Sequence, residues 1–216
     1  MENKNKIQCI DLGLIEYRKA YELQKCYVQD AITRGQNFLL ICEHPAVLTL
    51  GRLTNPKHIL VSQKLLEEKG IPMIAIDRGG DVTLHAPGQL VIYPILCLQY
   101  FGKDLKKYLW QLEQVAIDLL GDFDIVANRL EGKTGVWAQE KKIASIGIGV
   151  RKWVTFHGIG ININTDLDLF SLIKPCGLDV SMTSLSRIKN KSIKMQDVKI
   201  KLLDVFQAVF NVSQGI

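Results

Sequence analysis

The spacing of apolar positions predicts both strands and helices along this chain. Apolar and polar residues alternate with a period of two where a strand is half buried, and apolar residues recur every three or four positions on the buried face of a helix. These patterns predict strands at residues 7–13, 37–43, 46–51, 72–77 and 90–98, and helices at 16–33, about 62–69, about 104–120 and 194–210. Gly35 and Gly70 directly follow two of the helices, as is typical of helix ends.

The pattern changes between residues 124 and 164. Four short apolar segments alternate with turn-like stretches there, and they predict a series of hairpins at 124–129, 134–139, 142–150 and 153–164. Residues 168–186 are predicted to be loop and short turns. Because no repeat, low-complexity tract or linker interrupts the chain, we expect residues 1–216 to form a single catalytic domain. The predicted fold class is α+β (mixed α/β), a central mixed sheet with flanking helices.

Composition supports a globular protein. The chain has 216 residues, of which 47% are hydrophobic, and this is enough apolar material for one well-buried core. The longest apolar stretches, such as "LVIYPILCL" (90–98), are much shorter than the roughly 20 residues that cross a bilayer, and "MENKNK" lacks the apolar core of a signal peptide. We therefore expect a cytoplasmic protein that neither spans nor binds a membrane.

The formal net charge of +5 leaves several partners open. Basic residues mostly mix with acidic ones, and the densest basic run, 187–202, lacks the interleaved aromatic residues of a single-strand binder. We therefore expect no nucleic-acid partner. An acidic protein partner would explain the charge equally well, and so would an ordinary solvated surface.

The cysteines and histidines do not suggest a metal site. Five cysteines include no C-x-x-C pair, and their spacing fits neither a zinc site nor a disulfide framework. No two of the four histidines stand at the i, i+4 spacing of a helical metal site. We expect no metal and no cofactor.

Cys176 differs from the other cysteines because it stands in a turn-like segment, "IKPCGL" (173–178). Pro175 disfavours a helix there, and Gly177 lets the backbone turn closely. A cysteine reacts as its thiolate, which burial among apolar side chains disfavours. Cys9, Cys26, Cys42 and Cys97 lie in apolar strand or helix segments and are interpreted as small core residues. From the residues alone, Cys176 is either a nucleophile or an idle loop thiol.

A reactive thiolate needs a nearby activating group, and several candidates exist. Lys141 and Lys142 straddle a predicted turn, and in a strand they point to opposite faces. Both faces carry apolar residues, so the alternation does not choose between the two lysines, and an ordinary hairpin lysine is also open. His85 and His157 are further candidates for orienting the site or transferring a proton, with a purely structural role equally open.

A glycine-rich segment, "DRGGDVTLHAPGQLVIYPI" (77–95), follows one predicted strand and leads into the next. Its spacing matches neither the dinucleotide-binding fingerprint nor a Walker loop, so it gives no support for phosphate binding. The glycines would let the main chain approach a ligand closely, and turn chemistry alone would also explain them.

Four motifs together resemble the octanoyltransferase family over nearly the whole chain. They are "EHPAVLTLGR" (43–52), "RGGDVTLHAPGQLVIYPI" (78–95), "GVWAQEKKIASIGIGVRKWVTFHGIGININTDL" (135–167) and "IKPCGL" (173–178), and they occur in the family's order. The resemblance implies a fold similar to biotin and lipoate protein ligases. It also implies transfer of an octanoyl group from octanoyl-acyl carrier protein to a lysine of lipoyl domains, those of 2-oxoacid dehydrogenases and the glycine cleavage H protein, by a protein we expect to be a monomer.

The resemblance also assigns site residues. Cys176 matches the cysteine that accepts the acyl group, and Lys142, rather than Lys141, matches the lysine that lowers the pKa of that thiol. The residues that match the family's acyl-binding segments are Arg78, Gly79, Gly80, Asp81, Val82, Thr83, Leu84, His85, Ser145, Ile146, Gly147, His157, Gly158, Ile159 and Gly160. The implied reaction proceeds through an acyl thioester on the cysteine.

Other readings of the same sequence remain open. An ATP-dependent lipoate or biotin protein ligase shares the implied fold but needs no cysteine nucleophile. An amidotransferase that passes octanoyl groups between lipoyl domains also uses a cysteine. A non-catalytic module that binds acyl proteins is the third alternative.

Overall fold

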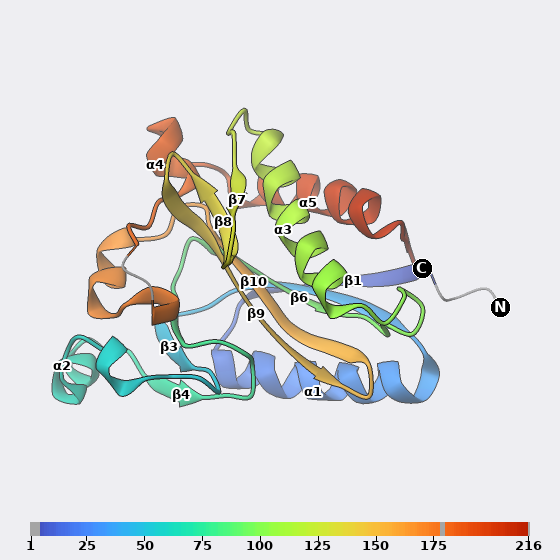
Figure 1. Cartoon of the computed structure of the whole chain (residues 1–216), viewed down its shortest axis with the longest axis horizontal. Helices are drawn as coiled ribbons and strands as arrows, with labels where there is room; N and C mark the ends of the chain where they lie inside the picture. The colour runs from blue at the N-terminus through green and yellow to red at the C-terminus, as the bar shows by residue number, and fades with distance from the viewer. Residues whose placement is uncertain (1–4, 178–179, 216) are drawn as a thin grey trace.

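A computed structural model describes residues 5–177 and 180–215 of the chain (Figure 1). Leu178 of the "IKPCGL" segment and the side chain of Cys176 lie outside the described residues. Eight strands form the larger sheet, in the order β11-β1-β2-β6-β10-β9-β8-β7. Their bounds are β1 Lys6–Leu14, β2 Asn37–Glu43, β6 Gln89–Ile95, β7 Asn128–Leu130, β8 Lys133–Ala138, β9 Lys141–Arg151, β10 Val154–Asn162 and β11 Ser213–Gln214.

A second, three-stranded sheet has the order β4-β3-β5, with β3 Val47–Leu50, β4 Met73–Ala75 and β5 Val82–His85. Both sheets are mixed. In the larger sheet β1 runs parallel to β2 and β11, whereas the other neighbours are antiparallel. In the smaller sheet β3 runs parallel to β4 and antiparallel to β5.

Helices cover both faces of the larger sheet (Figure 1). They are α1 Tyr17–Arg34, α2 Gln63–Glu68, α3 Leu105–Gly121, α4 Leu185–Lys189 and α5 Met195–Phe210, with short 3₁₀ turns at η1 Pro56–His58, η2 Leu167–Leu172 and η3 Pro175–Gly177. α3 and α5 pack together over one face, and α1 packs on β2, β6 and β10 from the other. None of the helices in the described part of the chain combines the length and apolarity needed to span a bilayer.

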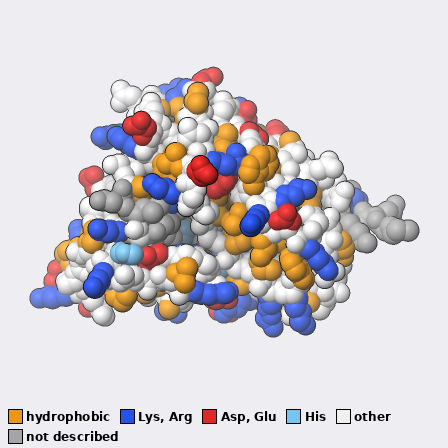
Figure 2. All heavy atoms as spheres, viewed as in Figure 1, with side chains coloured by type: hydrophobic (Ala, Val, Ile, Leu, Met, Phe, Trp, Pro, Cys, Tyr) orange, Lys and Arg blue, Asp and Glu red, His pale blue; other side chains and the backbone are white. Residues whose placement is uncertain are grey.

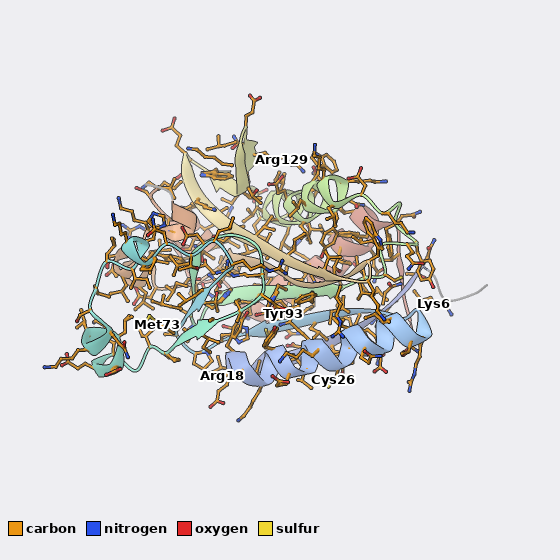
Figure 3. All side chains as sticks on the ribbon, turned by 60° about the horizontal axis from the view of Figure 1, so that its bottom comes forward. Lys6, Arg18, Cys26, Met73, Tyr93 and Arg129 are labelled. Carbon is orange, nitrogen blue, oxygen red and sulfur yellow. The ribbon has the colours of Figure 1, made fainter. Side chains whose placement is uncertain are left out.

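The alternation within β2 explains this layered arrangement. Leu39 and Ile41 point into the core beneath α3 and α5, whereas Phe38 and Leu40 point into the core beneath α1. Because successive side chains of a strand face opposite sides, an uninterrupted apolar strand such as β2 requires a covering layer on each face. Figure 3 shows Tyr93 of β6 on the side of the sheet that α1 covers.

The structure confirms the predicted fold class and nearly all of the predicted elements. β5 was not predicted, because its four residues lie inside the glycine-rich segment, and neither was the division of the strands into two sheets. The predicted strand at 124–129 is only the short β7, since Asp124 adopts a positive φ of 55° and Val126 is exposed.

One interpretation of the cysteines was wrong. Cys26 is not a core residue, because it lies on the exposed side of α1 (Figure 3). Cys42 and Cys97 are buried as expected, and Cys9 is half-buried. The apolar pattern of α1 places Ala20, Val28 and Ala31 against the sheet, and position 26 lies off that face.

Candidate active site

A pocket lies between the larger sheet and β5 of the smaller one. Ser145, Ile146 and Gly147 of β9 and His157, Gly158, Ile159 and Gly160 of β10 line it from the larger sheet. Arg78, Thr83, Leu84 and His85 line it from the glycine-rich segment and β5, and Tyr17, Gln89, Val91 and Tyr93 complete the wall. The space between the lining atoms is about 430 Å³, a value that includes open solvent.

Glycines on β9 and β10 make room for this pocket. Gly147 pairs with Gly158 across the two strands, and Ser145 pairs with Gly160. A β-carbon on Gly147 would lie 2.8 Å from Cδ of Arg78, and one on Gly160 would lie 2.8 Å from Oε1 of Gln89. Without these glycines, the side chains that line the pocket could not lie so close to the strands.

Arg78 is buried, lines the pocket and is held in place by hydrogen bonds. Its Nη2 donates to the backbone oxygen of Thr49 at 2.7 Å and to the Thr49 hydroxyl at 3.0 Å, and its Nη1 donates to the backbone oxygen of Gly79 at 3.1 Å. The backbone N–H of Gly79 donates to the oxygen of Ile148 at 2.8 Å, which ties the glycine-rich loop to β9. The guanidinium is therefore a fixed positive charge beside the pocket.

His85 and His157 line the pocket, His44 lies beside His85 with 5.6 Å between their ring centres, and burial keeps all three neutral at pH 7. Burial lowers the pKa of His157 from 6.5 to about 4, although its hydrogen bond to Asp77 acts in the opposite direction. Burial likewise lowers the pKa of His44 to about 4 and that of His85 to about 3. This part of the pocket wall is thus polar but carries no histidine charge.

Hydrogen bonds fix the orientation of these rings. Nε2 of His157 lies 2.8 Å from Oδ1 of Asp77, so a neutral His157 donates from Nε2 and accepts the Tyr17 hydroxyl at Nδ1, at 3.4 Å. Nδ1 of His44 donates to the backbone oxygen of Ile15 at 2.7 Å, and its Nε2 accepts the Tyr93 hydroxyl at 2.8 Å.

His85 begins a chain of hydrogen bonds that crosses the larger sheet. Its Nδ1 donates to Oε1 of Gln89 at 2.7 Å, and Nε2 of Gln89 donates to Oδ1 of Asn162 at 2.9 Å. Nδ2 of Asn162 donates to the backbone oxygen of Thr183 at 3.0 Å. The pocket wall is therefore connected to the segment that follows the Cys176 turn.

Lys142 lies at the start of β9 with a fully buried side chain, whereas Lys141 is exposed. Its Nζ donates to the backbone oxygen of Thr134 at 3.2 Å and lies 5.3 Å from the ring centre of Trp137. Gly135 makes room for the lysine, because a β-carbon there would lie 2.7 Å from Cε of Lys142. A buried ammonium beside a ring face and a carbonyl can stabilise an anion brought next to it.

The main chain of Lys142 is bonded to the segment after Cys176. The N–H of Lys142 donates to the oxygen of Ser181 at 2.9 Å, and the N–H of Thr183 donates to the oxygen of Lys142 at 2.9 Å. Lys142 and Met182 accordingly form a parallel β-bridge. Residues separated by about forty positions in sequence are thus joined at one place, and the joined residues 181–183 follow the Cys176 turn closely in the sequence.

Comparison with known proteins gives the family. Residues 16–207 match the family described as "Lipoyl protein ligase A/B catalytic domain". An octanoyltransferase of Syntrophotalea carbinolica is 44% identical over 201 residues, which cover 92% of each chain. The chain belongs to the octanoyltransferase family.

Solved structures of similar fold include protein ligases. A chain from a structural analysis of a bi-partite lipoate protein ligase and its E2 lipoyl domain from Thermoplasma acidophilum superposes with a TM-score of 0.74 at 14% identity, over 99% of this chain and 86% of that chain. The biotin protein ligase of Aquifex aeolicus in complex with biotin and ATP superposes with a TM-score of 0.58 at 18% identity, over 94% of this chain and 70% of that chain. The octanoyltransferase therefore has the fold of these ligases.

The structure brings most of the predicted acyl-binding residues of this octanoyltransferase into one pocket. Gly79, Gly80 and Asp81 instead line a neighbouring hollow, which they share with Gly147 and Thr134. The side chain of Val82 packs in the core of the smaller sheet and does not line the pocket.

Several residues around the pocket and around Lys142 were not selected from the sequence. They are Tyr17, His44, Asp77, Gln89, Tyr93, Thr134 and Gly135. Gln89 stands inside the quoted "HAPGQ" segment and could have been selected with it. Tyr17 gave no signal, because nothing local shows that the first turn of α1 reaches a pocket built mainly by residues 78–160. Among the described residues, no group of three or more His, Cys, Asp or Glu side chains could hold a metal ion.

Proposed function

We propose that this enzyme moves an octanoyl group from octanoyl-acyl carrier protein to a lysine of a lipoyl domain, through an octanoyl thioester on Cys176. The observation that carries the proposal is the burial of Lys142 together with its two main-chain hydrogen bonds to Ser181 and Thr183, just after the Cys176 turn. Membership of the octanoyltransferase family supplies the class of acyl group. Residues 1–216 act in this proposal as a single catalytic domain.

In the first step, the Cys176 thiolate attacks the thioester carbonyl of the acyl carrier protein. The Lys142 ammonium favours the thiolate before the attack and stabilises the oxyanion that develops during it. The tetrahedral intermediate then collapses, the bond to the carrier sulfur breaks, and the departing thiolate takes a proton from Lys142. The octanoyl group is left on Cys176 and Lys142 is neutral.

In the second step, the acceptor lysine attacks the thioester as its neutral amine, and the neutral amine of Lys142 takes the proton that the attacking nitrogen loses. The bond to the Cys176 sulfur breaks, and the ion pair of thiolate and ammonium is restored. An amide is more stable than a thioester, so the reaction proceeds without ATP. This requirement separates the proposal from an ATP-dependent lipoate or biotin ligase reaction.

The pocket between the sheets is the proposed site of the octanoyl tail. Its wall next to the tail is formed by Gly147, Gly158 and Gly160 with Ile146 and Ile159, which offer backbone and aliphatic surface. Each methylene removed from water contributes about 0.8 kcal/mol, so a tail of this length supplies several kcal/mol before ordering costs. The polar groups around His85 and His157 form another part of the wall.

The surface charge is suited to protein substrates. The chain carries a net charge of +5, and Figure 2 shows Lys and Arg side chains spread over the drawn face with acidic ones among them. The resemblance to the family implies acidic protein substrates, for which positive charge would speed the encounter. A lipoate protein ligase of this fold is described together with its E2 lipoyl domain as one lipoylation system, which supports a lipoyl domain as acceptor here.

A reconstituted transfer assay tests the proposal. Purified protein is mixed with octanoyl-acyl carrier protein and an apo lipoyl domain, without ATP, and the mass of the lipoyl domain is followed. We expect the domain to gain one octanoyl group, and we expect Lys142→Ala to slow this gain by about 100-fold or more because the acid and base of both steps is lost. Transfer that starts only when ATP and free octanoate are supplied would favour the ligase reaction instead.

A further inference from the structure

His58 and Asp81 form a pair outside the network of buried histidines. Nδ1 of His58 is bonded to Oδ2 of Asp81, and both side chains are largely shielded from solvent, with 23% and 11% of their surface exposed. The other oxygen of Asp81, Oδ1, accepts the N–H of Val82 at 2.6 Å and that of Asn55 at 3.2 Å. The carboxylate is therefore fixed from both sides, and it fixes the imidazole with its proton on Nδ1.

This pair contacts the turn that carries Cys176. The backbone oxygen of His58 accepts the N–H of Lys174 at 2.7 Å. Gly177 lies against both side chains: a β-carbon there would be 2.8 Å from Cε1 of His58 and 2.9 Å from Oδ2 of Asp81. The positive φ of Gly177, 69°, belongs to the left-handed region that favours glycine. The turn Pro175–Gly177 thus rests directly on the His58–Asp81 pair.

A β-bridge next to this pair also connects the two segments. Ile59 and Ile173 form an antiparallel bridge, and the N–H of Leu60 donates to the oxygen of Leu172 at 2.9 Å. Backbone contacts thereby hold residues 172–174 against residues 58–60. His58 is the residue of this second segment that also contacts the Pro175–Gly177 turn.

We propose that His58, oriented by Asp81, is a positioning residue that holds the Cys176 turn in place for acyl transfer. The inference rests on the proposed role of Cys176 as the acyl acceptor. Because a buried carboxylate holds Nδ1 of the ring, the ring cannot rotate away. Gly177 therefore packs against a side chain that keeps its position. Displacement of a reacting group by about 1 Å can cost on the order of 100-fold in rate, so a loosened turn should slow the thioester-forming step more than it weakens donor binding.

Three substitutions of His58 separate positioning from other roles. His58→Ala removes the ring, His58→Asn keeps an N–H close to the place of Nδ1, and His58→Gln places its amide near Nε2 instead. Lys57→Ala is the matched control, because Lys57 is the exposed neighbour of His58. For each protein, single-turnover formation of the octanoyl thioester is measured against the concentration of octanoyl-acyl carrier protein, well below the Tm of that protein.

We expect His58→Ala to lower the maximal rate by about 10- to 100-fold with the half-saturating donor concentration changed by less than about 3-fold. His58→Asn should recover most of the rate, His58→Gln should not, and Lys57→Ala should match the wild type. An unchanged rate for His58→Ala would overturn this inference alone. Rescue by His58→Gln but not His58→Asn would also overturn it, because Nε2 would then be the acting atom. A wild-type protein that forms no thioester would overturn the proposed function and this inference together.

Discussion

The side chain of Lys142 occupies space that exists because residue 135 is a glycine. A β-carbon on Gly135 would lie 2.7 Å from Cε and 3.2 Å from Nζ of the lysine, and 2.7 Å from the backbone oxygen of Ala144. Gly135 also has a φ of 136°, which residues with a side chain rarely adopt. The position of the buried ammonium is therefore set by the neighbouring strand β8 as well as by its own strand β9.

Gly135→Ala should displace Lys142 and slow octanoyl transfer. We expect a loss of about 100-fold in transfer rate, because the new methyl group and the ammonium cannot both keep their places, and a stability loss of about 1–3 kcal/mol from backbone strain. Transfer to a lipoyl domain and urea unfolding measure the two effects. Gly121→Ala is the control, since a β-carbon on Gly121 meets nothing within 4 Å. Equal rates for both variants would contradict this role of Gly135.

Glu113 of α3 holds Gly135 in place. Its Oε1 accepts the N–H of Gly135 at 3.1 Å, and its Oε2 accepts Nε of Arg129 at 3.0 Å. Glu113→Ala should destabilise the fold by about 1–3 kcal/mol because a buried N–H loses its acceptor, and it should also lower the transfer rate. Glu113→Gln keeps an amide oxygen for Gly135, so we expect it to retain more activity than Glu113→Ala. The two variants are compared by urea unfolding and by the transfer assay, and a Glu113→Gln variant as slow as Glu113→Ala would argue against the contact with Gly135.

Gly147 should influence the length of the acyl chain that is transferred. A methyl group there would enter the pocket wall and lie 2.8 Å from Cδ of Arg78. Each methylene that no longer fits costs about 0.8 kcal/mol, or about 4-fold in rate. We therefore expect Gly147→Ala to lower the preference for octanoyl over hexanoyl donors by about that factor or more, measured as the ratio of transfer rates. An unchanged ratio would mean that the tail does not pass Gly147.

The three buried histidines should make stability fall as pH is lowered. His44, His85 and His157 stay neutral in the folded protein down to pH values of about 4, 3 and 4, but in the unfolded chain they protonate near 6.5. The unfolded state therefore binds more protons between these values, and stability is complete above pH 6.5 and is lost as pH falls towards 4. The free energy of unfolding should be lower at pH 5 than at pH 7 by about 2 kcal/mol for each histidine.

Urea unfolding at pH 5 and pH 7 measures this loss, and His157→Gln provides the comparison. A side chain that cannot be protonated should make the loss between the two pH values smaller by about 2 kcal/mol, whatever its own effect at pH 7. A loss of the same size in wild type and His157→Gln would show that His157 does not stay neutral in the folded protein.

The amino-acid pattern was sufficient for most of the elements but not for their pairing. The helix at 16–33 could be predicted because apolar positions recur on one face and Gly35 ends it with a φ of 67°. The separation of β3, β4 and β5 into a second sheet could not be predicted, because the alternation of a strand shows which side chains are buried and not which strand lies beside it.

The choice between Lys141 and Lys142 shows the same limit within the site. Strict alternation could not decide which of the two lysines points into the core. The β8–β9 pair has a register shift between Val136 and Trp137, which interrupts the regular alternation of side chains at the start of β9. Ile143 and Ala144 are consequently both in the core, and Lys142 is fully buried while Lys141 is exposed. The contacts of Lys142 with Ser181 and Thr183, and of His58 with Asp81, join segments that no local pattern connects.

The most direct test of this account is the intact mass of the protein after brief exposure to octanoyl-acyl carrier protein, without ATP and without a lipoyl domain. We expect a gain of one octanoyl group that hydroxylamine removes, that peptide mapping locates on Cys176, and that does not form in Cys176→Ala. A wild-type protein that gains no octanoyl group, or whose octanoyl group is found on another residue, would contradict the central claim.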